Sequence, residues 1–281
     1  MTRKERVISN LSQYPNISKY LGKAIRKRLE IKGYTRGILT AHLLDSEASK
    51  KDVERLEQVL QLGEKYCTDF KYIFKEMNLP NKDLAIDGEI INTLAEVKAF
   101  EVLYSNHFED IKKIKPAQGK TADFTAKRND IPYAIEVIRI NLPVSDKKSP
   151  KPDSEKHIID KSGVTLASMY QYSSDTTGPK WEFTIKSATK EKYSQLEEYI
   201  KNQDKDAKGI IIISVGRDYF VSKFARRDMF LPRTLYKSLK NSFIELKQTE
   251  TYPYLQHVFF IAGKLENQTH LYPELNKEHS S

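Results

Sequence analysis

The sequence predicts an α/β domain with a central mixed sheet, preceded by a lobe of helices. Within residues 1–80, apolar residues recur every three or four positions, which is the spacing of amphipathic helices. After residue 80, patterns typical of helices and strands alternate, as they do in layered α/β domains. Two continuous apolar runs, 209–215 and 257–263, have the composition of strands that are buried on both faces. We therefore expect an N-terminal helical lobe at 1–80 and the α/β domain at 81–281.

The α/β domain is predicted to begin with a long helix over 87–108, whose apolar side includes Val97 and Phe100. Proline, serine and lysine dominate residues 142–180, which predicts a mobile insertion, although 158–172 also suits a short ordered element. The other predicted elements are a strand near 111–114, a hairpin over 122–141, helices at 189–202 and 235–246, and strands at 209–215 and 257–263.

The composition is typical of a globular protein. The chain has 281 residues, of which 39% are hydrophobic and 30% are charged. No apolar run approaches the roughly 18 residues that span a bilayer, and the basic N-terminus lacks the apolar segment of a secretory signal. Cys67 is the single cysteine, which excludes an intramolecular disulfide and a cysteine-based zinc cluster. We therefore expect a reducing, cytoplasmic location and no membrane partner.

The chain carries an excess of positive charge, with 47 Lys and Arg residues against 38 Asp and Glu residues, a formal net charge of +9. Basic side chains that neutralise phosphates release condensed counterions, so this excess favours a polyanionic partner such as nucleic acid. Lys19, Lys23 and Arg26 crowd the polar faces of an N-terminal helix. A phosphate-binding surface and an ordinary solvated helix face both explain these three residues.

The stretch ADFTAKRNDIPYAIEVIRIN is predicted to form two antiparallel strands joined by a tight turn at Asn129-Asp130. With this two-residue turn, Asp123 on the first strand faces Glu136 on the second, on one side of the sheet. Opposed carboxylates raise each other's pKa, and Mg²⁺, which prefers oxygen ligands, would compensate them in a chemically useful way. A longer turn would shift the register, and Pro132 favours irregular pairing. An ordinary hairpin without a metal site is therefore the alternative interpretation.

Glu96 is a third acid of interest, because it shares a stripe of its predicted helix with Phe100 and Leu103. An acid toward the apolar side of a helix usually has a partner. Either Glu96 takes part in a site with the other two acids, or it pairs with a nearby cation such as Lys98.

These residues, in this order, resemble the PD-(D/E)XK (restriction-endonuclease-like) nuclease superfamily over roughly residues 85–215. The likeness consists of a Glu-bearing helix (LAEVKAFEVL), an acid early in the second strand (TADF), a glutamate late in the third (AIEV), then a helix with a polar motif and a buried strand. The resemblance implies an αβββαβ core and a metal-dependent phosphodiesterase. It also implies that Asp123 and Glu136 bind Mg²⁺, for which Mn²⁺ substitutes, with the Val137 carbonyl as a further ligand. By the same resemblance, Glu96 holds a metal-bound water or a second ion.

One position departs from the family pattern. The lysine that stands two residues after the glutamate in E-x-K is replaced by Ile138, and Arg139 is expected to point to the opposite face of the strand. Lys192 and Gln195 lie on one stripe of the helix at 189–202. There they resemble the arrangement in family members whose catalytic lysine has moved from the strand to a helix. A plain surface lysine is the alternative for Lys192.

By this resemblance we expect a metal-dependent nuclease, with DNA favoured over RNA and endonuclease action favoured over exonuclease action. The expected catalytic residues are Asp123, Glu136, Lys192, Glu96 and Gln195. Gln195 and Tyr199 also match the Q-x-x-x-Y signature of one exonuclease-like branch. The residues expected to contact nucleic acid are Lys120, Lys127, Arg139 and Tyr199. The alternatives are a catalytically inactive nuclease-fold protein that binds nucleic acid or a protein partner, and a structural or interaction protein; a homodimer stays open.

Overall fold

The computed structural model describes residues 2–30, 47–75, 83–115, 121–140, 154–159, 165–171, 178–215, 252–262 and 269–270. The predicted helix at 235–246 and the predicted contact residue Lys120 lie outside these ranges. None of the described helices is long and apolar enough to cross a membrane.

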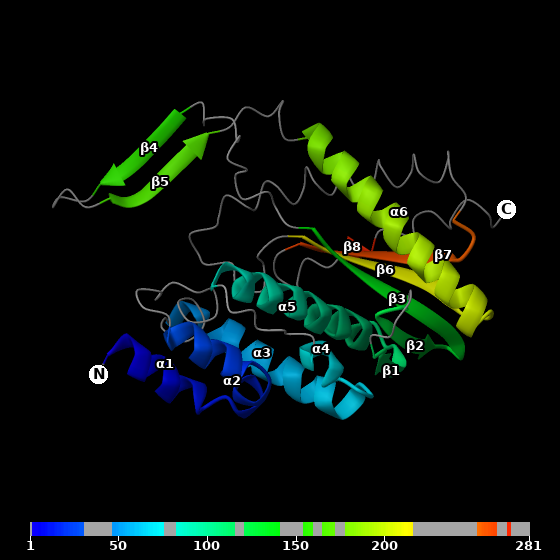
Figure 1. Ribbon diagram of the computed structural model, residues 1–281, viewed down its shortest axis with the longest axis horizontal. Coiled ribbons are helices and arrows are strands. Elements are labelled where there is room, and N and C mark those ends of the chain that lie inside the picture. Colours follow the sequence, from blue (N-terminus) through cyan, green and yellow to red (C-terminus); the bar gives the residue numbers. More distant parts are fainter. Residues whose placement is uncertain are drawn as a thin grey trace.

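A mixed six-stranded sheet lies at the centre of the fold, which confirms the predicted α/β class (Figure 1). Its strand order is β1-β2-β3-β6-β7-β8. The strands β1, β2 and β3 form an antiparallel meander, β6 and β7 run parallel to β3, and β8 is antiparallel to β7. The bounds of these strands are β1 Glu109–Lys113, β2 Phe124–Arg128, β3 Ile131–Ile140, β6 Lys208–Val215, β7 Leu255–Ala262 and β8 Thr269–His270.

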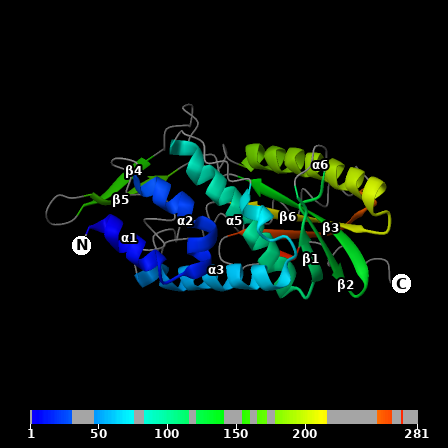
Figure 2. The ribbon, with the colours of Figure 1, turned by 60° about the horizontal axis from the view of Figure 1, so that its bottom comes forward.

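Two long helices cover the sheet, and four shorter elements pack beside the first of them (Figures 1 and 2). The long helices are α5 (Asp83–Ser105) and α6 (Gly178–Gln203). The N-terminal helices are α1 (Arg3–Leu11), α2 (Pro15–Glu30), α3 (Glu47–Tyr66) and α4 (Tyr72–Lys75). These four confirm the predicted helical character of the N-terminal region within its described residues. The domain boundary near residue 80 stays a prediction.

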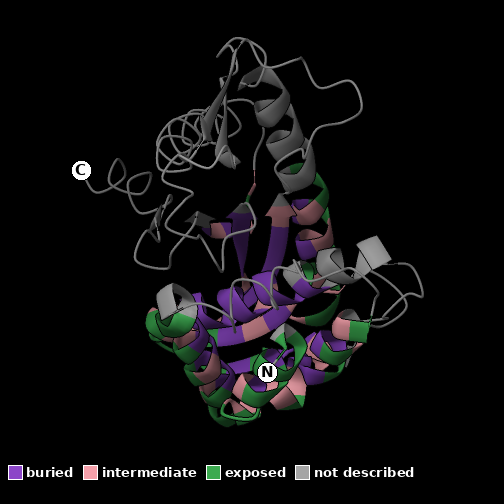
Figure 3. Cartoon of the chain, turned by 90° about the vertical axis from the view of Figure 1, so that its left-hand side faces the viewer, coloured by how far each residue is buried: buried purple, intermediate pink, exposed green. Residues whose placement is uncertain are grey.

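The two faces of β3 have different neighbours, because successive side chains of a strand point to opposite faces. Ile135 and Val137 belong to one hydrophobic core with residues of α3 and α5. Glu136 lies on the other face, where its carboxylate contacts Lys192 of α6. The central strands β3 and β6 and the middle of α5 are buried along most of their length (Figure 3). Glu136 is thus presented to α6 from the centre of a packed sheet.

The hairpin formed by β2 and β3 has the predicted two-residue turn. Asn129 and Asp130 have φ angles of 52° and 61°, the left-handed conformation that a tight hairpin turn of the I′ type requires at both positions. Their short polar side chains tolerate this conformation, which most residues avoid. Arg128 pairs with Ile131, and Phe124 pairs with Ile135, as the predicted register requires.

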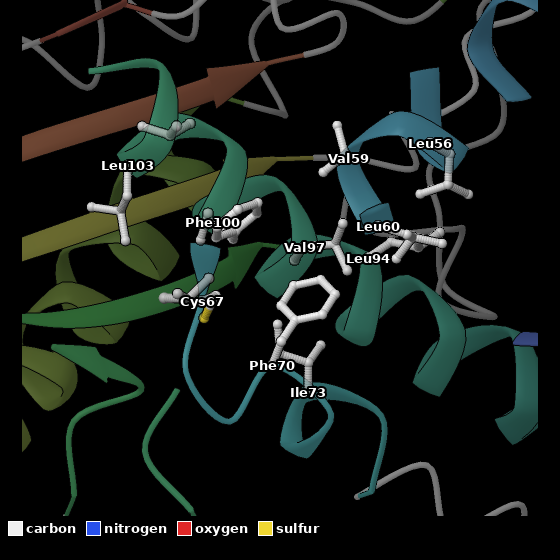
Figure 4. Close-up of a cluster of buried hydrophobic side chains, with 14 of the residues drawn as sticks. Leu56, Val59, Leu60, Cys67, Phe70, Ile73, Leu94, Val97, Phe100 and Leu103 are labelled. Carbon is white, nitrogen blue, oxygen red and sulfur yellow. The ribbon is translucent and has the colours of Figure 1, made fainter. Parts of the chain in front are cut away.

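The N-terminal helices are joined to the sheet layer through an aromatic cluster around Phe70 (Figure 4). The Phe70 ring lies edge-on to Tyr20 and Phe100, with ring centroids 5.8 and 5.4 Å apart. Side chains of α3 and α5, among them Leu60 and Val97, enclose it. One core therefore runs from the helices to the sheet.

Gly63 of α3 lies directly against the Phe70 ring, and a Cβ atom at this position would overlap the ring. We expect Gly63→Ala to lower the free energy of unfolding by about 1–3 kcal/mol, because an enclosed ring has to shift. Gly22→Ala is the matched control, since its Cβ would meet only the ends of the Ser18 and Arg26 side chains, at 3.3 Å or more. This control should gain about 0.5–1 kcal/mol from higher helix propensity. Urea denaturation measures both; a loss of equal size in the two variants would contradict the packing.

The segment predicted as a mobile insertion, about 142–180, contains two antiparallel strands, β4 (Ser154–Ile159) and β5 (Thr165–Gln171). They form a separate two-stranded sheet, which agrees with the short ordered element that the sequence allowed. The helix α6 begins at Gly178 rather than at 189 as predicted. Pro179 suits the first turn of a helix, where a missing N–H costs nothing, and this signal was overlooked.

Candidate active site

Asp123 lies immediately before β2 and is fixed against the middle of β3. Its backbone N–H donates to the Ile135 carbonyl at 2.9 Å, and its Oδ2 accepts from the Val137 N–H at 2.8 Å. The two contacts straddle Glu136. Asp123 Oδ1 lies 3.3 Å from the Lys113 ammonium. The predicted proximity of Asp123 and Glu136 is therefore confirmed, while their roles stay predictions.

Glu136 is completely buried. Burial, followed by repulsion from the nearby Asp123 carboxylate, raises the pKa of Glu136 from 4.5 to about 8, although the Lys192 ammonium acts in the opposite direction. Its Oε1 has no hydrogen-bond partner among the described residues. The unsatisfied oxygen and the raised pKa both show that the surrounding groups do not fully compensate the negative charge of Glu136.

The raised pKa of Glu136 predicts how stability depends on pH in the absence of divalent cations. Between about pH 4.5 and 8 the unfolded chain loses this proton while the folded chain keeps it, so stability falls as the pH rises. The loss should reach several kcal/mol, since one pKa unit corresponds to about 1.4 kcal/mol. Glu136→Gln removes this contribution, so the variant should be more stable than the native protein at pH 8. Urea titrations in EDTA from pH 5 to 8 measure the difference; parallel curves for the two proteins would contradict it.

Lys192 reaches Glu136 from α6. Its ammonium lies 2.9 Å from Glu136 Oε2 and 2.9 Å from Gln195 Oε1, one turn further along the helix. On the other stripe of α6, Tyr193, Leu196 and Ile200 are buried and fix the orientation of the helix on the sheet. The Lys192 side chain is 30% exposed, and its ammonium has two hydrogen-bond partners.

Glu96 of α5 and Asp123 share a cation that the sequence prediction did not include. Lys113, the last residue of β1, lies with its ammonium 2.8 Å from Glu96 Oε2 and 3.3 Å from Asp123 Oδ1. Only 4% of the Lys113 side chain is exposed. Burial lowers the pKa of Lys113, but the carboxylates of Glu96 and Asp123 outweigh this effect and raise it. Lys113 is thus a partner of Glu96, for which the sequence had suggested a nearby cation such as Lys98.

The remaining predicted residues lie around this centre or away from it. Ile138 is buried and brings no cation to the strand position of E-x-K. Arg139 donates to Asn92 Oδ1 of α5, so it lies on the opposite face from Glu136, as alternation along the strand predicted. Tyr199 lies on α6 and is half-buried. Lys127 lies near the hairpin turn, at the other end of β2 from Asp123, and pairs with Asp110 at 2.9 Å.

The donor set at Asp123 and Glu136 suits a small divalent cation. Mg²⁺ needs only one or two carboxylates and otherwise retains water. The unsatisfied Glu136 Oε1 and the raised pKa of Glu136 are the features that a nearby cation would compensate. No group of three or more His, Cys, Asp or Glu side chains in the described part of the chain is arranged to hold a metal ion. The two carboxylates therefore form the ligand set to consider, with the Val137 carbonyl as the further ligand that the family resemblance implies.

Comparisons with known proteins identify no relative of this chain. No family model matches the chain, and no curated protein or solved structure matches it. The contacts of the residues themselves therefore carry the functional proposal.

Proposed function

We propose that the protein is a metal-dependent nuclease of the PD-(D/E)XK type that hydrolyses phosphodiester bonds in nucleic acid, with DNA favoured over RNA. The observation that carries the proposal is the contact between the Lys192 ammonium and Glu136 Oε2, at 2.9 Å. It joins a lysine from a helix to an acid on a strand whose own E-x-K position holds Ile138. The two residues are 56 positions apart in the sequence, so their contact arises from the tertiary fold and not from local helix or strand geometry.

The order of elements supports the same proposal. Between β3 and α6 the chain forms the separate β4–β5 hairpin; apart from it, the elements from α5 to β6 follow the helix and strand order of an αβββαβ core. In it, β1 to β3 are antiparallel and β6 is parallel to β3. Asp123 precedes the second of these strands, and Glu136 lies within the third. The net charge of +9 favours a polyanionic substrate.

In the proposed reaction a water oxygen bonds to phosphorus, and the bond from phosphorus to the leaving sugar oxygen breaks. The water releases a proton to solvent, and the leaving oxygen takes one up from solvent. A divalent cation, when bound by Asp123, Glu136 and the Val137 carbonyl, supplies a more acidic water and neutralises phosphate charge. Lys192 contributes a fixed positive charge beside Glu136, where negative charge on the phosphate increases during the reaction. Gln195 holds this ammonium in place by accepting one of its N–H groups.

Cleavage assays test the proposal directly. Single- and double-stranded DNA and RNA, linear and circular, are incubated with the protein in Mg²⁺, in Mn²⁺ and in EDTA. We expect cleavage with either metal ion and none in EDTA, and cleavage of circular DNA is expected if the action is endonucleolytic. Intact substrates of all these kinds in both metal ions would contradict the proposed function.

A second candidate function is an inactive nuclease-fold protein that binds nucleic acid or a protein partner. The observation in its favour is that two lysines already pair with the acids, Lys192 with Glu136 and Lys113 with Glu96 and Asp123. Calorimetry distinguishes the two candidates, because an active site has to bind Mg²⁺ or Mn²⁺, whereas a site compensated by lysines alone would bind neither. Binding of nucleic acid that weakens steeply with salt but needs no metal ion would favour this second candidate.

A further inference from the structure

Lys113 is a buried lysine between two acids of the proposed site. Its ammonium lies 2.8 Å from Glu96 Oε2 and 3.3 Å from Asp123 Oδ1, and 5.0 Å from the centre of the Phe124 ring. Removing an ammonium group from water is costly unless opposite charges and hydrogen bonds replace the water. Here two carboxylates and an aromatic face do so, which makes Lys113 a fixed cation of the site.

The backbone around Lys113 is held on both sides, which fixes the point from which its side chain starts. The Lys113 N–H donates to the Thr68 carbonyl at 3.0 Å, and the next residue, Ile114, donates to the Asp123 carbonyl at 3.0 Å. Lys113 also pairs with Phe124 in the sheet. These contacts join the segment between α3 and α4, the edge strand β1 and the start of β2 at one point. The fold therefore fixes the base of the Lys113 side chain, and the two carboxylates hold its ammonium.

A metal ion bound at Glu136 requires this carboxylate to be ionised, and the formal charges of the five side chains then favour one metal ion over two. Glu96, Asp123 and Glu136 carry three negative charges when ionised, and Lys113 and Lys192 carry two positive charges. The balance is one negative charge. One divalent cation reverses it, whereas a second would place two further positive charges in a site that already holds two ammonium groups, one of them buried.

We propose that the Lys113 ammonium takes the place of a second divalent cation between Glu96 and Asp123, so that the site binds one metal ion per chain. This inference rests on the proposed metal-dependent function. It gives Glu96 a different role from the one implied by the family resemblance: Glu96 holds Lys113, and through it Asp123, rather than a second ion. Lys113 is a positioning residue in this scheme, because it acts on the proposed metal ligand Asp123 and not on the substrate.

The number of metal ions bound by the native protein is the first test. Titration with Mn²⁺ and with Ca²⁺ in a calorimeter, without nucleic acid, should give one ion per chain. Two ions per chain would overturn the inference and leave the proposed function in place. Binding of neither ion would overturn the proposed function, and the inference with it.

Substitution of Lys113 provides the second test, again without any measurement of activity. Lys113→Met keeps a long side chain but removes the charge, so a second ion should bind between the two acids and the stoichiometry should rise from one to two. Adding Glu96→Gln to this variant should return the stoichiometry to one ion per chain. Lys113→Arg, which keeps the positive charge, should also bind one ion. Lys127→Met is the matched control, because it removes an exposed lysine from the neighbouring strand and should leave the value at one.

Circular dichroism and urea denaturation show whether Lys113→Met folds. A folded Lys113→Met protein that binds a single ion would overturn the inference. If that variant does not fold, the native protein and Lys113→Arg still decide it, because two ions bound to either of them would contradict a lysine in the place of the second ion.

Discussion

Mg²⁺-dependent cleavage is expected to fall by about 100-fold or more in Glu136→Gln and in Asp123→Asn. Each change removes one charged ligand of the proposed metal ion, and the loss of such a ligand raises the barrier by several kcal/mol. Both substitutions keep the size of the side chain, and an asparagine oxygen can still accept from the Val137 N–H as Asp123 Oδ2 does. Initial rates at saturating substrate, with the native protein in parallel, measure the effect.

The control for this prediction is Asp110→Asn, which removes an exposed acid from the neighbouring strand β1. The Asp110 side chain is 68% exposed and contacts Lys127, remote from Glu136 in the strand register. Its rate should equal that of the native protein. Unchanged cleavage in both site variants, or an equal loss in the control, would rule out the assigned ligands.

Lys192→Met is the second substitution with a large expected effect, again a loss of about 100-fold in kcat. The change removes the ammonium that compensates Glu136 and that would stabilise charge developing on the phosphate. Lys192→Arg should restore only part of the rate, since a planar guanidinium cannot take the same place between Glu136 and Gln195. Single-turnover cleavage under saturating protein separates this effect on chemistry from an effect on substrate binding.

Lys201→Met is the matched control, because Lys201 lies on the same helix but pairs on the surface with Glu197, one turn away. Exposed pairs of this kind contribute little to stability, so the variant should fold and cleave like the native protein. An equal loss of activity in the Lys192 and Lys201 variants would indicate that the helix supplies only general positive charge.

The parts of the fold that depend on local chemistry could be predicted from the sequence. The Asn129-Asp130 pair tolerates two consecutive left-handed conformations, and this fixed the turn, the register and the neighbourhood of Asp123 and Glu136. Helical spacing placed Lys192 and Gln195 on one stripe, and their mutual contact follows from that spacing. Contact between this stripe and β3 needed the tertiary structure.

Lys113 was missed because its importance arises from contacts distant in the sequence. The sequence contained one relevant signal: Lys113 follows Ile111 by two positions in a strand, so it occupies the same face as a buried apolar residue. A lysine at such a position requires an acidic partner nearby. The identity of its partners, Glu96 and Asp123, depends on the packing of α5 against the sheet, which no local pattern specifies.

A crystal structure of the protein grown with Mn²⁺ tests the central claim most directly, because the anomalous scattering of manganese locates the ion without assumptions about its ligands. The proposed function predicts a peak bonded to the carboxylates of Asp123 and Glu136, with the Lys192 ammonium close by. Absence of a peak at these two carboxylates, in well-ordered crystals grown at millimolar Mn²⁺ concentrations, would contradict it.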